Sequence, residues 1–207
     1  MKKFFALLMI LAGAAGLRAG EFVEKFAGDN LSPQDWMVTY AVRCGGIDYR
    51  RPLRGKLVID GLKKAKSQDA VAFLDRDADF TAGNFRLTAR LAAEPAGEGA
   101  GSWSFQLLTE NGELLLGATL ETNHGKVVLS GMRGHSCTTL KNTPLPVAEP
   151  RGVLEIVRKK GIYQVFFNGK MAYEANGDTA AAASFRLQVA GKPGVLTLEG
   201  LSLQNIR

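Results

Sequence analysis

The stretch FRLTARL at residues 85–91 alternates apolar and polar side chains at every position, and in WMVTYAVR at 36–43 large apolar residues occupy every second position, alternating with Met37, Thr39, Ala41 and Arg43. A period of two residues is the signature of a β-strand with one face in a core and the other in water. No stretch of the chain beyond residue 20 sustains a helical period. The pattern therefore predicts an all-β protein.

Further short runs of the same kind follow along the chain and are separated by turn signals. Three Asn-Gly pairs, at 111–112, 168–169 and 176–177, could supply the positive φ that tight hairpin turns require. Short antiparallel strands without helices bury their apolar faces best as two packed sheets. We therefore expect one domain, residues 21–207, folded as a two-sheet antiparallel jelly-roll β-sandwich. Its other strands are expected at 56–59, 70–74, 103–108, 114–121, 126–129, 153–158, 162–168, 185–189 and 195–203.

The first 20 residues have the order of an export signal. Lys2 and Lys3 precede the apolar run Phe4–Leu11, and small residues lead to Ala19-Gly20. The apolar run is shorter than the roughly 20 residues that span a bilayer. We predict a signal peptide at 1–20, a secreted or periplasmic mature chain starting near Gly20 or Glu21, and no transmembrane anchor in that chain.

The formal charge of +6 overstates how basic the mature chain is. Three of the 26 cationic residues, Lys2, Lys3 and Arg18, lie in the leader, so 23 remain against 20 acidic residues. Binding to nucleic acid depends on a dense cationic surface. This balance, together with export, argues against a nucleic-acid partner.

The two cysteines, Cys44 and Cys137, could form a disulfide in an oxidising compartment. A crosslink closing so long a loop would add roughly 4 kcal/mol in the chain-entropy model. Two separate buried thiols are the alternative, because Cys44 continues the apolar positions of the strand before it.

Three segments carry a resemblance to a known family: Phe22 to Phe26 followed by Trp36, the strand GNFRL at 83–87, and the hairpin GIYQVFFNGK at 161–170. Together they resemble the concanavalin A-like lectin and glucanase superfamily, including laminin-G-like bacterial domains. The resemblance implies a jelly-roll sandwich whose relatives bind or cleave carbohydrates. It favours an exported, non-catalytic domain that binds a poly- or oligosaccharide, with an anionic glycan as one candidate.

Two catalytic alternatives and one structural alternative stay open. The Glu-x-Asp-x-x-Glu strand common in hydrolases of the superfamily is absent, and Glu110, Glu113 and Glu121 are not arranged as a pair that could flank a glycosidic bond. A polysaccharide lyase would need a base and a group that neutralises a uronate. His124, His135 and Tyr163 could serve as that base. A structural module of the cell envelope is the third possibility.

Alternating acids suggest a metal site. Asp75, Asp77 and Asp79 would share one side of an extended strand and could offer oxygen ligands to Ca²⁺. An EF-hand is excluded because Phe80 and Arg86 occupy its required glycine and glutamate positions.

The two tryptophans, Trp36 and Trp103, share the apolar positions of their strands and are expected in the core. Polar contacts, rather than aromatic stacking, would then recognise a sugar. The residues predicted to bind carbohydrate are Arg86, Arg90, Gln106, Glu121, Arg186 and Gln188.

Overall fold

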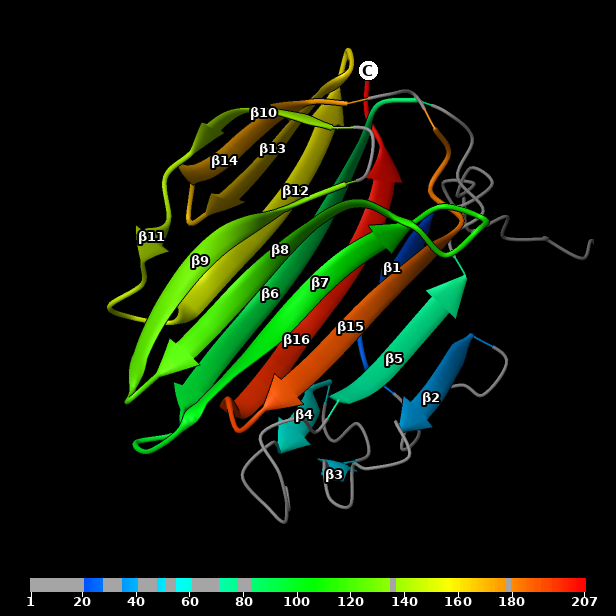
Figure 1. Cartoon of the computed structure of the whole chain (residues 1–207). Coiled ribbons are helices and arrows are strands. Elements are labelled where there is room, and N and C mark those ends of the chain that lie inside the picture. The colour runs from blue at the N-terminus through cyan, green and yellow to red at the C-terminus, as the bar shows by residue number, and fades with distance from the viewer. Residues whose placement is uncertain are drawn as a thin grey trace, which may run out of the picture.

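The computed structural model describes residues 21–27, 35–40, 48–50, 55–60, 71–77, 83–134, 137–177 and 180–207, leaving aside the side chains at 38–40, 48–50, 71–74 and 77. The predicted signal peptide lies outside these residues. Within these described segments, sixteen strands, all paired antiparallel, make up two stacked sheets (Figure 1). None of the described segments forms a helix with the length and apolar character needed to cross a membrane. The predicted all-β jelly-roll sandwich is confirmed.

The nine-stranded sheet has the order β10-β14-β13-β12-β6-β16-β4-β3, and β1 also pairs with β16. Its centre is the pair β6–β16, which runs almost the whole length of both strands. Its strands are β1 (Phe22–Glu24), β3 (Asp48–Arg50), β4 (Leu57–Asp60), β6 (Phe85–Pro95), β10 (Thr138–Asn142), β12 (Arg151–Lys159), β13 (Ile162–Phe167), β14 (Lys170–Asn176) and β16 (Gly194–Asn205).

The seven-stranded sheet has the order β11-β9-β8-β7-β15-β5-β2 and faces the viewer in Figure 1. Its centre is formed by β7, β8 and β15. Its strands are β2 (Trp36–Tyr40), β5 (Val71–Asp77), β7 (Ala100–Leu108), β8 (Leu114–Asn123), β9 (Lys126–Arg133), β11 (Leu145–Pro146) and β15 (Ser184–Gly191).

The core lies between the two sheets and takes one side of every central strand. On β7, Trp103, Phe105 and Leu107 are all fully buried, as are Leu120, Ala118 and Leu116 opposite them on β8. Trp36 is 5% exposed and meets Phe185 edge to face at 6.3 Å. The prediction that both tryptophans belong to the core is confirmed, and the alternate residues of their strands point away from that core.

Positive-φ pairs close several of the described hairpins. Asn168 and Gly169 have φ of 48° and 75° and join β13 to β14, as predicted. The dipeptide Asn176-Gly177 does not close a hairpin. Asn176 ends β14, and Gly177 begins the connection to β15, which lies in the other sheet.

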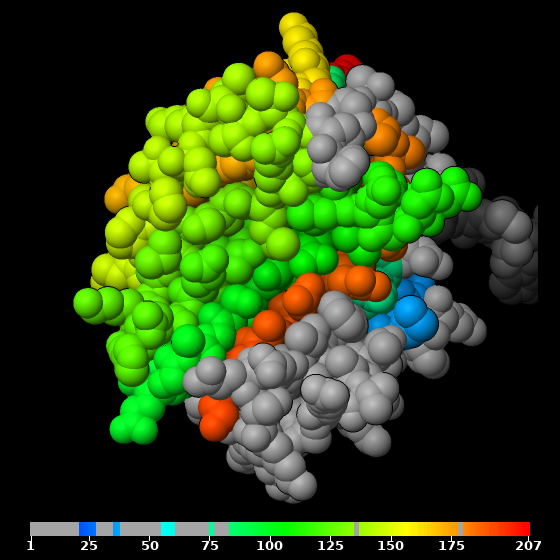
Figure 2. All heavy atoms as spheres, in the orientation of Figure 1, coloured from blue at the N-terminus to red at the C-terminus, as the bar shows by residue number. Residues whose placement is uncertain are grey.

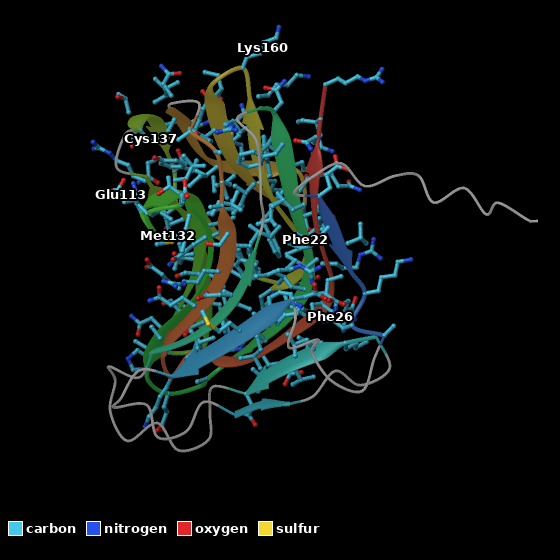
Figure 3. The ribbon with its side chains drawn as sticks, turned by 90° about the vertical axis from the view of Figure 1, so that its right-hand side faces the viewer. Phe22, Phe26, Glu113, Met132, Cys137 and Lys160 are labelled. Carbon is cyan, nitrogen blue, oxygen red and sulfur yellow. The ribbon has the colours of Figure 1, made fainter. Side chains whose placement is uncertain are left out.

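An N-terminal strap joins the two sheets. The Glu24 carboxylate accepts a hydrogen bond from Trp36 Nε1 at 3.1 Å and from Arg76 Nη1 at 3.1 Å. The Arg76 guanidinium also lies 4.5 Å from the centre of the Phe22 ring. Phe22 and Phe26, both labelled in Figure 3, pack inward against the seven-stranded sheet, with ring centroids 6.4 Å from those of Phe185 and Trp36, respectively. The strap thus anchors the first described residues to the sandwich.

Candidate functional site

The outer side of the seven-stranded sheet is lined with polar side chains, and we call it the front face. It is the side turned to the viewer in Figure 2, where the green atoms of β7 and β8 lie next to the orange-red atoms of β15. The alternation that sends Trp103 and Phe105 inward sends their neighbours outward. Its described outward residues on β7, β8, β9 and β15 include Ser102, Ser104, Gln106, Thr119, Glu121, Lys126, Val128, Ser130, Met132, Arg186 and Gln188.

One row of residues crosses the front face from strand to strand. Asp75, Arg186, Gln106, Gly117 and Met132 stand opposite one another in the register of β5, β15, β7, β8 and β9. Gly117 leaves room for Met132, because a Cβ at position 117 would lie 3.2 Å from the Met132 sulfur. The Gln106 amide lies 4.0 Å from the same sulfur. These residues therefore form a continuous packed surface.

An ion pair occupies one end of this row. Nε and Nη2 of Arg186 donate to the two carboxylate oxygens of Asp75 at 2.7 and 2.9 Å. The side-chain hydrogen bond with Asp75 raises the pKa of Arg186, while burial acts in the opposite direction. Two parallel bonds to a planar guanidinium fix the positions of both groups.

Two side-chain hydrogen bonds order the centre of the face. Gln106 Nε2 donates to Gln188 Oε1 at 2.9 Å, and the hydroxyls of Ser104 and Thr119 lie 3.0 Å apart. Gln106 is only 7% exposed, whereas Gln188 is partly exposed. An amide has two donor hydrogens and a carbonyl acceptor, so each glutamine keeps hydrogen-bonding capacity beyond this bond.

The six predicted carbohydrate-binding residues fall on two opposite faces. Gln106, Glu121, Arg186 and Gln188 belong to the front face. Arg86 and Arg90 lie on the outer side of the nine-stranded sheet, both exposed on β6. A single ligand on one face therefore cannot contact all six.

The two arginines of the nine-stranded sheet have acidic neighbours. Arg86 Nε lies 3.5 Å from Glu155. Arg90 lies near Glu199, whose pKa is lowered chiefly by the hydrogen bond from Lys56 and further by Arg151 and Arg90. These are exposed charges of mixed sign, as on an ordinary hydrated surface.

The described carboxylates of the front face do not form a catalytic pair. Asp75 and Glu121 are three inter-strand spacings and four residues apart, which corresponds to about 19 Å in a regular sheet. Hydrolases need two carboxyl groups about 5 to 9.5 Å apart. Glu110 and Glu113 are in or beside the exposed turn between β7 and β8.

The predicted lyase residues are not brought together. Tyr163 is fully buried in the sandwich, with its hydroxyl 3.4 Å from Arg158 Nη1. His124 lies in the turn between β8 and β9 with a φ of 45°. His135 lies outside the described residues. The buried Tyr163 hydroxyl and the His124 ring in its turn therefore do not form one lyase site.

The metal and disulfide predictions fall partly outside the described residues. Both Asp75 oxygens are engaged by Arg186, the Asp77 side chain and Asp79 are not described, and no cluster of three potential metal ligands occurs among the described side chains. Cys137 is 3% exposed, with its thiol 3.5 Å from the Leu115 carbonyl. Cys44 is not described, so the disulfide stays a prediction.

A hollow of about 730 Å³ lies at the edge of the sandwich. It is bounded by the end of β6, the turn between β8 and β9, and the segment 146–150, and Glu94 and Lys126 are its ionisable residues. Prolines, valines and alanines form most of its lining. It contains neither the glutamine pair nor the ion pair of the front face.

Sequence reasoning missed Ser130 and Met132 on the front face. It ended the strand that contains them at Leu129, because the residues after Leu129 do not continue the alternation. Asp75 was interpreted as a metal ligand because it alternates with Asp77 and Asp79; no local pattern indicated its partner Arg186, which lies 111 residues away in the sequence.

The two sheets and their order define a concanavalin A-like sandwich. No protein-family model and no curated protein sequence matches the chain. Solved structures of both lectin-like domains and glycoside hydrolases share the fold.

Three of these structures represent the lectin-like domains and the hydrolases. The potassium-bound carbohydrate recognition domain of Emp46p is 8% identical, with a TM-score of 0.62 over 93% of this chain and 100% of that one. The β-glucanase of Bacillus licheniformis is 11% identical, with a TM-score of 0.59 over 90% and 99%. The GlcNAcα1-4Gal-releasing endo-β-galactosidase of Clostridium perfringens is 13% identical with a TM-score of 0.58. The alignment covers 90% of this chain but only 63% of that protein. At such identities the likeness establishes the fold.

Proposed function

We propose that this chain is an exported, non-catalytic domain that binds carbohydrate on its front face. The observation that carries the proposal is the ordered amide pair of Gln106 and Gln188 beside the hydroxyl pair of Ser104 and Thr119. Sugars present many hydroxyls that both donate and accept hydrogen bonds. Fixed amide and hydroxyl groups can match them with little loss of side-chain entropy on binding.

Exposure shows which side chains a ligand would reach. Ser104, Gln106 and Thr119 are each no more than 7% exposed, so they mainly support their neighbours. Gln188, Ser130 and Met132 are partly exposed. Gln188 would therefore make direct hydrogen bonds, while Gln106 would position it.

The same face supports binding better than cleavage. The two described carboxylates are too far apart to act on one glycosidic bond, and Asp75 is already paired with Arg186. The hydrolases among the structural neighbours keep a glycan-cleaving enzyme as the competing function. Binding by glycan-recognition domains of the same fold is consistent with the proposal.

A glycan-binding screen with matched variants tests the proposal. The mature protein is applied to an array of poly- and oligosaccharides, and hits are measured by isothermal titration calorimetry. Replacing Gln188 by Ala should weaken binding by about 10-fold or more, since losing a good hydrogen bond costs about 1.4 kcal/mol. The control Gln204→Ala removes the same group from the exposed end of β16 on the opposite face and should leave binding unchanged.

Three results would contradict the proposal. Equal loss of binding in Gln188→Ala and Gln204→Ala would place the site elsewhere. Release of reducing ends by the purified protein, abolished by Glu121→Gln, would establish the hydrolase alternative. No binding to any glycan would favour a structural envelope module.

A further inference from the structure

We infer that the glycan bound by the front face is uncharged; this inference rests on the proposed function and specifies its ligand. The sequence suggested an acidic polysaccharide, with outward arginines as its ligands. Only one of those arginines, Arg186, lies on the front face, and it is already engaged.

The Arg186 guanidinium has its strongest acceptor within the protein. Its Nε and Nη2 donors both bind Asp75, whose side chain is only 12% exposed. A carboxylate of a uronic acid would meet a guanidinium whose charge is already balanced by this partly buried partner and whose Nε edge is occupied, so it could take that bidentate position only by displacing Asp75. Separating such a pair leaves a poorly hydrated charge behind, which costs more than an exposed contact returns.

The remaining charges do not attract an anion either. Among the described ionisable side chains of the front face, Glu121 is exposed on β8, and Lys126 stands at the end of β9 on the same side. With Arg186 and Asp75 they make two cations and two carboxylates. The described face thus has no net positive charge to steer an acidic chain.

The other side chains of the front face that could recognise a ligand are uncharged. The partly exposed Gln188 amide, Ser130 hydroxyl and Met132 thioether offer neutral donors, acceptors and an apolar contact, and the buried side chains of Gln106, Ser104 and Thr119 support them. These groups suit the hydroxyls and C–H surfaces of a neutral glucan, galactan or xylan.

Binding at two salt concentrations tests the inference on the wild-type protein. Neutral and uronic-acid polysaccharides are compared by affinity electrophoresis and calorimetry in about 50 and about 500 mM NaCl, between which the Debye length shortens several-fold. We expect binding to a neutral polysaccharide with a Kd that is nearly independent of salt, and no comparable binding to an acidic one. Salt-sensitive binding to a uronic-acid polysaccharide would overturn the inference while leaving the proposed carbohydrate function intact. Failure to bind any polysaccharide would overturn both.

A charge variant tests the role of the ion pair through a gain of binding. Asp75→Asn removes the counter-charge of Arg186 with little change of shape, so it should create salt-sensitive binding to a uronic-acid polysaccharide that the wild-type protein lacks. The matched control Glu155→Gln removes an acid that faces Arg86 on the other sheet and should create none. A folded Asp75→Asn protein that gains no such binding, or gains no more than Glu155→Gln, would overturn the role assigned to the ion pair.

Discussion

The Arg186 guanidinium on β15 and the Asp75 carboxylate on β5 stand directly opposite each other in the sheet register and are joined by two hydrogen bonds of 2.7 and 2.9 Å. The pair fastens β5, which lies next to the edge strand β2, to the centre of the seven-stranded sheet. The same contact both stabilises the sheet and removes a cation from the front face.

The first prediction concerns the stability that this pair provides. Asp75→Asn should lower the free energy of unfolding by about 1.5 to 3 kcal/mol, the range for hydrogen bonds to charged groups. Glu155→Gln, which breaks the exposed pair with Arg86 at 3.5 Å, should cost no more than about 1 kcal/mol. Urea unfolding of both variants measures the difference. Equal losses of unfolding free energy in the two variants would show that the second hydrogen bond and the lower exposure of the Asp75 pair add nothing to stability.

The second prediction concerns Trp103, whose ring is fully buried and whose Nε1 meets no acceptor among the described residues. Trp103→Ala should cost about 3 to 5 kcal/mol because it leaves a large cavity. Trp103→Phe should cost clearly less, since it keeps a ring and also removes a buried unpaired donor that itself costs about 1 to 3 kcal/mol.

Thermal and urea unfolding distinguish the two tryptophan variants. Equal destabilisation by Phe and Ala would mean that the indole N–H is satisfied, for example by a buried water. A Trp103→Ala protein that keeps its stability but loses glycan binding would contradict the core assignment and favour an aromatic platform.

The third prediction concerns the close approach of the two sheets at Gly131. A Cβ at this position on β9 would overlap the ring of Tyr173 on β14 in the opposite sheet. Gly131→Ala should therefore destabilise the fold by about 1 to 3 kcal/mol through overpacking. Gly97→Ala is the control, because nothing lies within 4 Å of the added Cβ and its φ is not positive. Its effect should stay within about 1 kcal/mol of zero, and a Gly131→Ala protein equally close to wild type would refute the contact.

The fourth prediction concerns export. The mature protein from its native host should lack Lys2 and Lys3 and begin near Gly20 or Glu21. Intact-mass analysis of the secreted or periplasmic fraction measures this directly. Recovery of the full-length chain from the cytoplasm would contradict the predicted localisation and remove the reason to expect a disulfide between Cys44 and Cys137.

Features that depend on neighbouring residues were accessible from the sequence. Alternation along 85–91 and 103–108 identified strands and placed Trp103 in the core, because successive side chains of a strand must point to opposite sides. The hairpin turn at Asn168-Gly169 was likewise predictable, since these residue types tolerate positive φ. The strand β10 was not found, because all five of its residues are exposed and no apolar period marks it.

Features that depend on which strands become neighbours were decided only by the tertiary structure. Alternation showed that Arg86 and Arg186 point outward, but it could not show that they point outward from different sheets. Asn176-Gly177 resembles a hairpin turn and instead connects the two sheets.

The sequence by itself determined the class of fold and, for the strands with a clear alternation, which side faces the core, because both follow from a local period of two residues. Only the tertiary structure decided that Asp75 pairs with Arg186 and that Gln106 meets Gln188. These partners are 111 and 82 residues apart. The physical reason is that strand order is set by how the whole chain buries its apolar faces, and no local pattern records the strand that will lie alongside.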